Sequence, residues 1–200
     1  GNHYDAQLSG NNVKSRKNTA MVGDACAEFN VKGNGVGDSF MYHMEHQLPV
    51  TETFTLSTWI ILPSDVSSRM TIAWIPPRTN ALGGASNYTG PYGGSDFINR
   101  PTGAIYTQNG VLYFEANTAD GQTLLLNTTI PRTDKTNNMH KANWTHVAMT
   151  YDHGIMKAYK SGELIGTAMA TNYPVEAVEN WGLYIGARPT NPGLNNLQFT

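Results

Sequence analysis

The sequence has little charge, a single cysteine and no long apolar run, and each shortage excludes a class of protein. Only 14% of its 200 residues are charged, against roughly 25% in an average globular chain. The net charge of -2 and the pI near 6.3 provide no basic surface, so nucleic acid is not an expected partner. No stretch approaches the roughly 18 apolar residues of a membrane-spanning helix, so no membrane insertion is expected. The lone Cys26 excludes an internal disulfide.

The motifs of the common hydrolases are also missing. Glycosidases use two carboxylates that flank the sugar bond, and a spacing of two on one strand brings both to one face. No two of the 15 acidic residues stand at that spacing. Glu28 and Glu115 would be a pair from separate strands, but nothing in the pattern singles them out. No Gly-x-Ser-x-Gly elbow, phosphate loop or cysteine pair for zinc occurs. The sequence therefore predicts a protein that is not an enzyme, with a polysaccharide-cleaving enzyme as the weakest alternative.

What the sequence does contain is a series of short alternating runs separated by turn residues. In the clearest run, Val147, Met149 and Tyr151 alternate with smaller or polar side chains, which is typical of a strand half-buried on each face. Gly154 and Gly162 then supply the positive φ that tight reversals need. The stretch predicts a three-stranded β-meander with strands at residues 145–151, at 155–160 and from 163.

Residues 54–62 form the strongest single strand pattern. Phe54, Leu56 and Ile60 lie on one face, which is expected to join the core. The opposite face is half apolar, so a loop, a partner or a ligand is expected to cover it. Tryptophan at a strand position is more often a core residue than a contact residue. Three tryptophans are accordingly expected in the core: Trp59, Trp74 and Trp144.

Other runs complete the pattern of an all-β chain. Asn109-Gly110 is a strong signal for a two-residue hairpin turn. The basic residues Lys14, Arg16 and Lys17 are expected in a solvated loop. The remaining strands are expected at residues 4–8, 25–31, 40–44, 70–75, 105–106, 111–115, 123–130 and 182–187.

Several of these segments resemble a known family, among them the Phe-Thr-x-Ser-x-Trp run at residues 54–59 and the Leu-x-Ile-Gly run at residues 183–186. Residues 144–164 resemble the signature of laminin-G-like domains, which runs Trp, a polar residue, His-Val-Ala, Thr-Tyr-Asp, then Tyr-x-x-Gly-Glu-Leu. Ser161 stands where the family usually has Asn, a mild departure that leaves the turn intact. A second block matches at Phe29, Gly37 and Asp38. The matching residues of the first block are Trp144, His146, Val147, Ala148, Thr150, Tyr151, Asp152, Tyr159, Gly162, Glu163 and Leu164.

The resemblance implies an all-β fold, a two-sheet antiparallel β-sandwich of the concanavalin A-like jelly-roll type. One such domain is expected to occupy residues 1–200. Laminin-G-like domains normally end with a further strand beside the first one, and no matching segment follows residue 190. The chain is therefore expected to be part of a longer one. Donation of that strand by another chain, or a fold that closes differently, are the alternatives.

The longest irregular stretch, residues 76–103, is the expected binding loop. Loops of this length in a compact domain are usually functional or disordered, and disordered segments rarely carry so many aromatic side chains. Aromatic rings cover the apolar C–H face of sugars, while amides and carboxylates bind the hydroxyls. The alternative is that Tyr88, Tyr92 and Phe97 pin the loop to the body of the domain. The predicted ligand-binding residues are Asn87, Tyr88, Tyr92, Asp96, Asn99, Arg100 and Tyr106.

Metal and glycan sites follow from the resemblance and from short motifs. Laminin-G-like domains often hold calcium at a loop end, and Asp38 and Asp96 lie in Gly-rich turns suited to that role. Turn chemistry alone also accounts for both residues. Asn-x-Thr motifs make Asn87 and Asn127 candidate glycosylation acceptors. The composition, rich in Asn, Thr, Ser and Gly, predicts an extracellular, cell-surface or virion-surface location.

The sequence therefore predicts a non-catalytic module that binds a carbohydrate or glycoprotein, within a secreted or surface-exposed protein. Calcium is the one cofactor that the resemblance allows. The first alternative is a structural or adhesive unit of a surface layer, filament or virion, in which the same sandwich packs against copies of itself.

Overall fold

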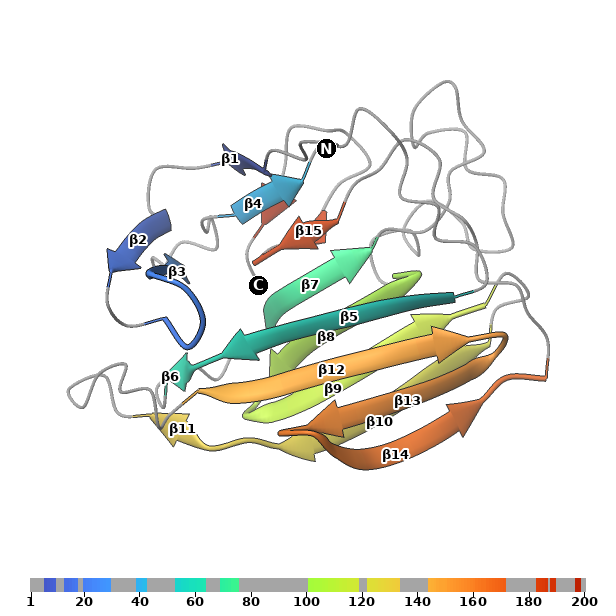
Figure 1. Ribbon diagram of the computed structural model, residues 1–200. Helices are drawn as coiled ribbons and strands as arrows, with labels where there is room; N and C mark the ends of the chain where they lie inside the picture. Colours follow the sequence, from blue (N-terminus) through green and yellow to red (C-terminus); the bar gives the residue numbers. More distant parts are fainter. Residues whose placement is uncertain are drawn as a thin grey trace, which may run out of the picture.

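The chain folds into a sandwich of two antiparallel sheets (Figure 1). The computed structural model describes residues 6–9, 13–17, 20–29, 39–42, 53–63, 69–75, 101–118, 122–133, 144–171, 183–186, 188–189 and 197–198. Over these ranges the chain forms strands and turns and no helix. The described residues accordingly include no helix that could cross a membrane. The predicted all-β, two-sheet sandwich is confirmed.

The larger sheet has seven strands, and every neighbouring pair in it is antiparallel. Strand β15, from the C-terminal part of the chain, lies between two strands from much earlier in the sequence, because Tyr184 pairs with both Met41 and Trp74. This crossover joins the two ends of the chain in one sheet. In spatial order the strands are β1 (Ala6–Ser9), β4 (Ser39–Tyr42), β15 (Tyr184–Ile185), β7 (Met70–Ile75), β8 (Gly103–Gln108), β9 (Val111–Asn117) and β10 (Thr123–Thr129).

The smaller sheet has four strands and lies in front of β7 to β10 in Figure 1. In order they are β14 (Glu163–Met169), β13 (Ile155–Lys160), β12 (Thr145–Asp152) and β5 (Thr53–Ile60). The predicted meander is therefore confirmed, and β5 is added beside β12. Three short pairs accompany the sandwich: β2 (Val13–Lys17) with β3 (Ala25–Phe29), β6 (Leu62–Pro63) with β11 (Arg132–Thr133), and β16 (Arg188–Pro189) with β17 (Leu197–Gln198).

Three tight turns connect the strands of the two meanders. Each has positive φ at both central residues, which is the geometry of the type I′ turn that matches the twist of a hairpin. The second residue is glycine in all three, because a residue without Cβ adopts this conformation without strain. The predicted hairpin turns are thereby confirmed, with φ values of 50° and 83° at Asn109-Gly110, 45° and 84° at His153-Gly154, and 51° and 85° at Ser161-Gly162.

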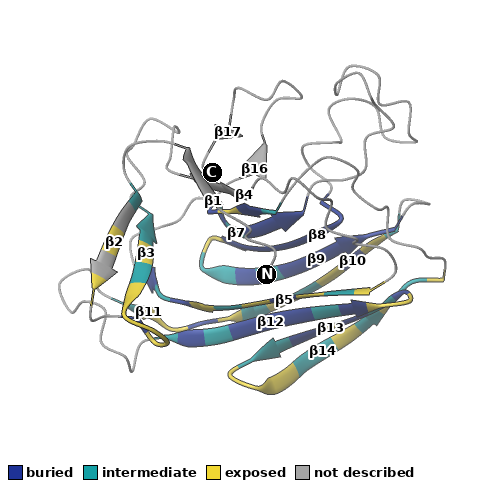
Figure 2. Ribbon diagram, turned by 45° about the horizontal axis from the view of Figure 1, so that its top comes forward, coloured by how far each residue is buried: buried dark blue, intermediate teal, exposed yellow. Residues whose placement is uncertain are grey.

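The core lies between the two sheets, and Figure 2 shows β12 as mostly buried, whereas β14, at the edge of its sheet, has only intermediate and exposed positions. Val147 and Phe114, from opposite sheets, are both fully buried. Phe54 stacks on Tyr151 with ring centroids 5.5 Å apart. The same ring lies over Gly103, where a Cβ atom would come within 2.5 Å of it. Glycine is therefore required at this position for the sheets to approach so closely.

Two expectations from the sequence are wrong. Trp59 is not a core residue, because its side chain is 36% exposed on the face of β5 opposite Leu56 and Ile60. The basic stretch that includes Lys17 is a strand and not a solvated loop. It pairs antiparallel with β3 over its whole length. Ladder hydrogen bonds use the backbone, so a polar run forms a strand where a neighbour supplies the pairing.

The other two tryptophans behave differently from each other. Trp74 is fully buried, as expected, although it lies on the side of the larger sheet that faces away from the inter-sheet core. Trp144 is half-buried at the start of β12. At the other end of the larger sheet, β1 pairs only with β4 among the described strands. A further strand beside β1 and a longer chain stay predictions.

Candidate binding site

The outward side of the four-stranded sheet, called the open face below, presents hydroxyl, aromatic and charged side chains to solvent. Because side chains alternate along a strand, every second residue of β5, β12, β13 and β14 reaches this side. Residues directly opposite one another on neighbouring strands form rows across the sheet. These rows are Trp59–His146, then Ser57–Ala148–Tyr159–Leu164, then Thr55–Thr150–Lys157–Thr167, and last Thr53–Asp152–Ile155–Met169.

One end of the open face carries a cluster of Trp59, His146 and Ser57. The indole of Trp59 and the imidazole of His146 contact each other with centroids 5.1 Å apart and planes at 56°. Ser57 Oγ and His146 Nε2 are 2.9 Å apart and share a hydrogen bond. The register explains the contact, since Trp59 lies directly opposite His146 and Ser57 belongs to the next row. An exposed indole is thus held beside two groups that form hydrogen bonds.

The middle and the far end of the open face form a hollow of about 430 Å³. Ala148, directly opposite Tyr159 on the neighbouring strand, has only a methyl side chain. Tyr159 therefore stands as a second aromatic surface, about 12 Å from Trp59 by strand spacing and rise per residue. The lining residues are Thr53, Phe54, Thr55, Thr150, Tyr151, Asp152, Ile155, Lys157 and Tyr159.

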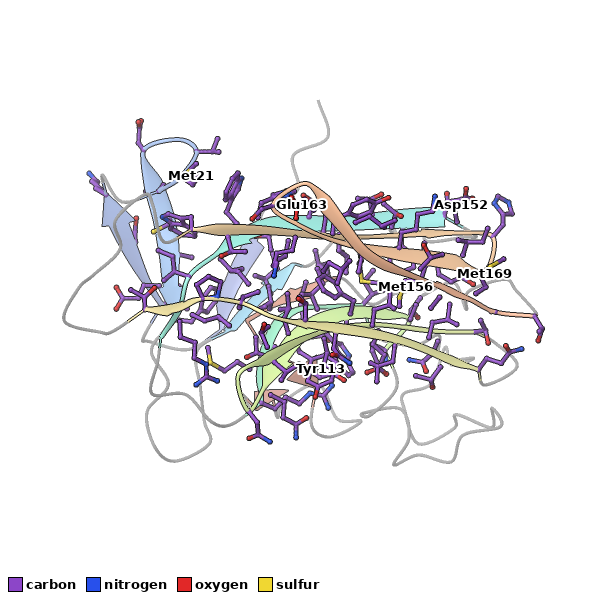
Figure 3. All side chains as sticks on the ribbon, turned by 90° about the horizontal axis from the view of Figure 1, so that it is seen from below. Met21, Tyr113, Asp152, Met156, Glu163 and Met169 are labelled. Atoms are coloured by element: carbon purple, nitrogen blue, oxygen red, sulfur yellow. The ribbon has the colours of Figure 1, made fainter. Side chains whose placement is uncertain are left out.

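The edge of the open face along β14 is apolar. Leu164 is 55% exposed and Met169 is 70% exposed, and both point to the same side as Tyr159 and Ile155. Figure 3 shows Met169, Asp152 and Glu163 along this side of the molecule, with Met156 between the sheets. The open face therefore joins a polar, partly aromatic centre to an apolar border.

The outward side of the seven-stranded sheet, called the covered face below, is by contrast mostly buried. Figure 3 shows Tyr113 on this side, opposite the open face. Most residues of the covered face are less than a tenth exposed, while Arg69 and Tyr113 are half-buried. The residues that make up the covered face are Arg69, Thr71, Trp74, Ala104, Tyr106, Tyr113, Glu115, Asn117 and Tyr184.

The carboxylate of Glu115 organises the covered face through hydrogen bonds. Tyr106 donates its hydroxyl to Glu115 Oε2 at 3.0 Å, and Asn117 Nδ2 donates to Glu115 Oε1 at 3.0 Å. Asn117 Nδ2 also donates to the carbonyl of Pro101 at 2.6 Å. Asn117 Oδ1 accepts from Thr123 Oγ1 at 2.6 Å. This network ties together the start of β8 and strands β9 and β10.

Burial on this face changes the titration of two tyrosines. Desolvation, reinforced by the negative charge of Glu115, raises the pKa of Tyr106 above its usual range. Burial alone raises the pKa of Tyr184 to about 12. Both hydroxyls therefore stay protonated at neutral pH. In that state Tyr106 acts as the hydrogen-bond donor to Glu115.

Comparison with known proteins gives the family. The model of the concanavalin A-like lectin/glucanase superfamily matches residues 34–198, which is more than half of the chain. The chain belongs to this superfamily. The resemblance seen in the sequence is thereby confirmed. None of the curated protein sequences matches the chain.

Solved structures of the same fold include binding domains of bacterial toxins. The botulinum neurotoxin serotype D binding domain superposes with a TM-score of 0.58 at 18% identity, over 97% of this chain and 41% of that chain. The serotype G binding domain gives a TM-score of 0.58 at 12% identity, over 97% and 41%. The serotype D ligand binding domain in complex with N-acetylneuraminic acid gives 0.57 at 18%, over 97% and 40%. This superfamily member therefore spans less than half the length of these neighbours, and the likeness shows the fold.

Most of the site residues predicted from the sequence lie outside the described residues of this superfamily member. Tyr106 is the described member of the predicted ligand set, and it is 7% exposed with its hydroxyl bound to Glu115. Its contact with a ligand stays a prediction, as does glycosylation at Asn127, an exposed residue of β10. The predicted residues outside the described ranges are Asp38, Asn87, Tyr88, Tyr92, Asp96, Asn99 and Arg100.

The described residues contain no complete catalytic or metal-binding group of the kinds considered from the sequence. No group of three or more His, Cys, Asp or Glu side chains in the described ranges could hold a metal ion. Glu115 is engaged by Tyr106 and Asn117, while Glu28 lies in the separate β2–β3 pair. No described carboxylate is hydrogen-bonded to His146, so its bond to Ser57 lacks the third group of a Ser-His-Asp triad.

The sequence analysis missed the cluster at Trp59. Residues Thr55 and Ser57 precede Trp59 on one face of β5, so that face carries more hydroxyl than apolar groups. The polar neighbours of Trp59 on this face were the available signal that Trp59 lies at the surface. His146 gave no such signal, because only pairing of β12 with β5 places it opposite Trp59.

Proposed function

We propose that the protein is a non-catalytic, lectin-like module that binds carbohydrate chains on its open face. The observation that carries the proposal is the exposed indole of Trp59, in contact with His146 and next to the Ser57 hydroxyl. Sugar rings expose C–H groups on one side and hydroxyls around the rim, so they bind best where an aromatic surface lies beside hydrogen-bonding groups.

The rows of the open face suit a ligand longer than one sugar. Trp59 would stack against one ring, with Ser57 and His146 bonding its hydroxyls. Tyr159, at the edge of the hollow, would receive a neighbouring ring. Thr55, Thr150, Lys157 and Asp152 would supply further hydrogen-bond donors and acceptors, and they already line the hollow. The face is a preformed strand scaffold, which keeps the ordering cost of binding low.

Relatives support a binding role rather than a catalytic one. The superfamily model is that of lectins and glucanases, and the neighbouring structures are described as receptor or ligand binding domains, one of them in complex with N-acetylneuraminic acid. The location that we propose is outside the cell or on a cell or virion surface, with a glycan or glycoprotein as partner. The predicted loop residues Asn87 to Arg100 and calcium at Asp38 or Asp96 remain part of this proposal.

A glycan array, followed by titration of the best ligand, tests the proposal. Trp59→Ala should weaken binding about 5- to 30-fold, since a stacked aromatic contact in a sugar site contributes on the order of 1–2 kcal/mol. Ser57→Ala should weaken it by a smaller factor. Leu125→Ala is the matched control, because Leu125 is 46% exposed on the other sheet. Unchanged binding in Trp59→Ala, with the protein folded, would remove the open face from the proposal.

Self-association is the second candidate function, and the apolar border of the open face favours it. Leu164 and Met169 are the most exposed apolar residues of β14, the outermost described strand of its sheet. An assembly unit would bury them against a copy of the chain. Sedimentation of the wild type and of Leu164→Glu decides the matter: a concentration-dependent oligomer that the substitution disperses supports assembly, and a monomer at all concentrations contradicts it.

A further inference from the structure

The covered face contains an arginine, Arg69, that contacts aromatic rings and no described carboxylate. The guanidinium carbon of Arg69 lies 3.8 Å from the ring centroid of Tyr106 and 5.4 Å from that of Trp74. Cation–π contacts of this kind fix the plane of the guanidinium without using its N–H groups. Within the described ranges Arg69 forms no hydrogen bond or ion pair. The carboxylate of Glu115, on the same face, accepts hydrogen bonds from Tyr106 and Asn117 instead.

The unused groups of Arg69 form a fork. Nε and Nη2 are both buried and lack a hydrogen-bond partner. These two nitrogens lie on the same edge of the guanidinium, and their parallel N–H bonds match the two oxygens of a carboxylate. A buried donor without a partner costs about 1–3 kcal/mol, more when it is charged. Leaving both nitrogens of a charged fork unpaired is therefore a strongly unfavourable arrangement, unless a ligand completes it.

Two further polar atoms on the same face are also buried without a partner, Trp74 Nε1 and Thr71 Oγ1. A β-bulge at Ile72 explains why these residues share a face although they are three positions apart. The carbonyl of Ile72 accepts a hydrogen bond from Gly186 at 3.0 Å, which fixes the bulge. Arg69, Thr71 and Trp74 therefore offer several donors around aromatic rings in one place.

We infer that the covered face holds a second binding site, and that its ligand is a sugar carrying a carboxylate. The carboxylate would accept two hydrogen bonds from Arg69 Nε and Nη2. Sugar hydroxyls would pair with Trp74 Nε1 and Thr71 Oγ1, and the rings of Tyr106 and Trp74 would border the sugar. Half-buried Arg69 and Tyr113 mark the side from which the ligand enters. This site is independent of the open face and of the function proposed for it.

Titration of the 15N-labelled wild-type protein is the first test of the inference. Sodium glucuronate and N-acetylneuraminate should shift the indole Nε1–H signal of Trp74 and the Nε–H signal of Arg69, whereas glucose should shift neither. Assignment of the indole signal comes from Trp74→Phe. Equal shifts with glucose, or no shift with either acid, would overturn the site. Sodium acetate at the same affinity as glucuronate would overturn the assignment to a sugar.

Substitution of Arg69 then tests the fork. Arg69→Lys keeps the charge but removes the parallel N–H pair, so it should weaken glucuronate binding tenfold or more. Arg69→Gln should abolish it. Arg132→Lys, the same change at an exposed position of β11, serves as the control and should have no effect. Retained affinity in Arg69→Lys would show that a point charge suffices, which contradicts the fork. Thermal unfolding of each variant verifies that the protein is folded.

Discussion

The two outward faces of the sandwich are built by the same strand alternation, yet they end in opposite environments. On the open face, Thr55, Ser57 and Trp59 of β5 are all exposed. On the covered face, the corresponding positions Tyr106 of β8 and Glu115 of β9 are each 7% exposed. A strand that is buried on both sides needs large apolar or fully bonded side chains on both sides. The residue types on each outward face therefore agree with whether that face is buried or exposed.

The comparison also shows two ways to present polar groups. The open face offers hydroxyls to water, where an unbonded donor costs little. The covered face withdraws its polar groups from water and satisfies Glu115 and Asn117 with four hydrogen bonds. Arg69 differs, because its buried Nε and Nη2 have no hydrogen-bond partner. Exposed groups suit exchangeable contacts with a chain of sugars, whereas a desolvated charge suits one selective contact.

The largest expected effect separates the two tryptophans. Trp74→Ala should lower the free energy of unfolding by about 3–5 kcal/mol, because it removes a fully buried indole and leaves a cavity. Trp59→Ala should lower it by about 1 kcal/mol or less, since its side chain is partly exposed. Urea denaturation of both variants measures the difference. Equal losses of stability would mean that the open face is covered in solution, which would contradict the difference between the two faces.

A smaller effect is expected from the polar network. Asn117→Ala should cost about 2–3 kcal/mol, because it leaves Glu115 Oε1, the carbonyl of Pro101 and the Thr123 hydroxyl without their partner. Thr55→Ala, an exposed position of the open face, should change stability by no more than about 0.5 kcal/mol. The same denaturation measurement applies, and a small loss in Asn117→Ala would show that water replaces the network.

Alkaline pH should weaken the covered face first. The pKa of Tyr184 is about 12 in the folded protein against 10.0 for the free side chain, and that of Tyr106 is also raised. The folded state therefore keeps protons that the unfolded state loses. The contribution of Tyr184 to the free energy of unfolding is fully present below pH 10. It falls by about 2–3 kcal/mol as the pH rises from 10 toward 12.

Urea midpoints between pH 8 and pH 11.5 measure this fall. Tyr184→Phe should flatten the slope above pH 10, because the group that titrates is gone. A slope that is unchanged in this variant would assign the alkaline loss to other groups. The part of the tyrosinate absorbance that Tyr184→Phe removes should rise with unfolding and not before it.

The smallest effect concerns the turn between β13 and β14. Ser161 has φ of 51°, a conformation that Asn tolerates better than Ser. Ser161→Asn should therefore raise the free energy of unfolding by about 0.5 kcal/mol and leave the Trp74 indole signal unchanged. A loss of stability would show that the Ser161 hydroxyl has a role in the turn. A shifted Trp74 signal would show that the two sheets are coupled more closely than their separate faces indicate.

Much of the fold could be predicted from local patterns. Period-2 alternation predicted β5 and β12, and Gly at 110, 154 and 162 placed the hairpin turns. These features depend on a few consecutive residues. Strand β2 was missed because its residues are polar, and its pairing partner β3 decides its conformation. The position of β15 between β4 and β7 likewise depends on residues distant in the sequence.

The site was harder to predict. Tyr106 was selected for its place near the long loop, and the structure buries it beside Glu115 and under Arg69. Trp59 was assigned to the core because a large apolar ring on a strand usually lies there. Whether a face is covered depends on what packs over it, and the segment that does so can be distant in the sequence. Residues Ser57 and His146 are 89 positions apart and meet only because β5 pairs with β12.

The sequence by itself determined the all-β class, the family and the three type I′ turns, because alternation, turn glycines and a short signature act over a few neighbouring residues. Only the tertiary structure decided which outward face is open, which tryptophan is exposed, and that Arg69 lies over Tyr106 with its fork unpaired. Register and sheet order set these outcomes, and both result from the packing of the whole chain.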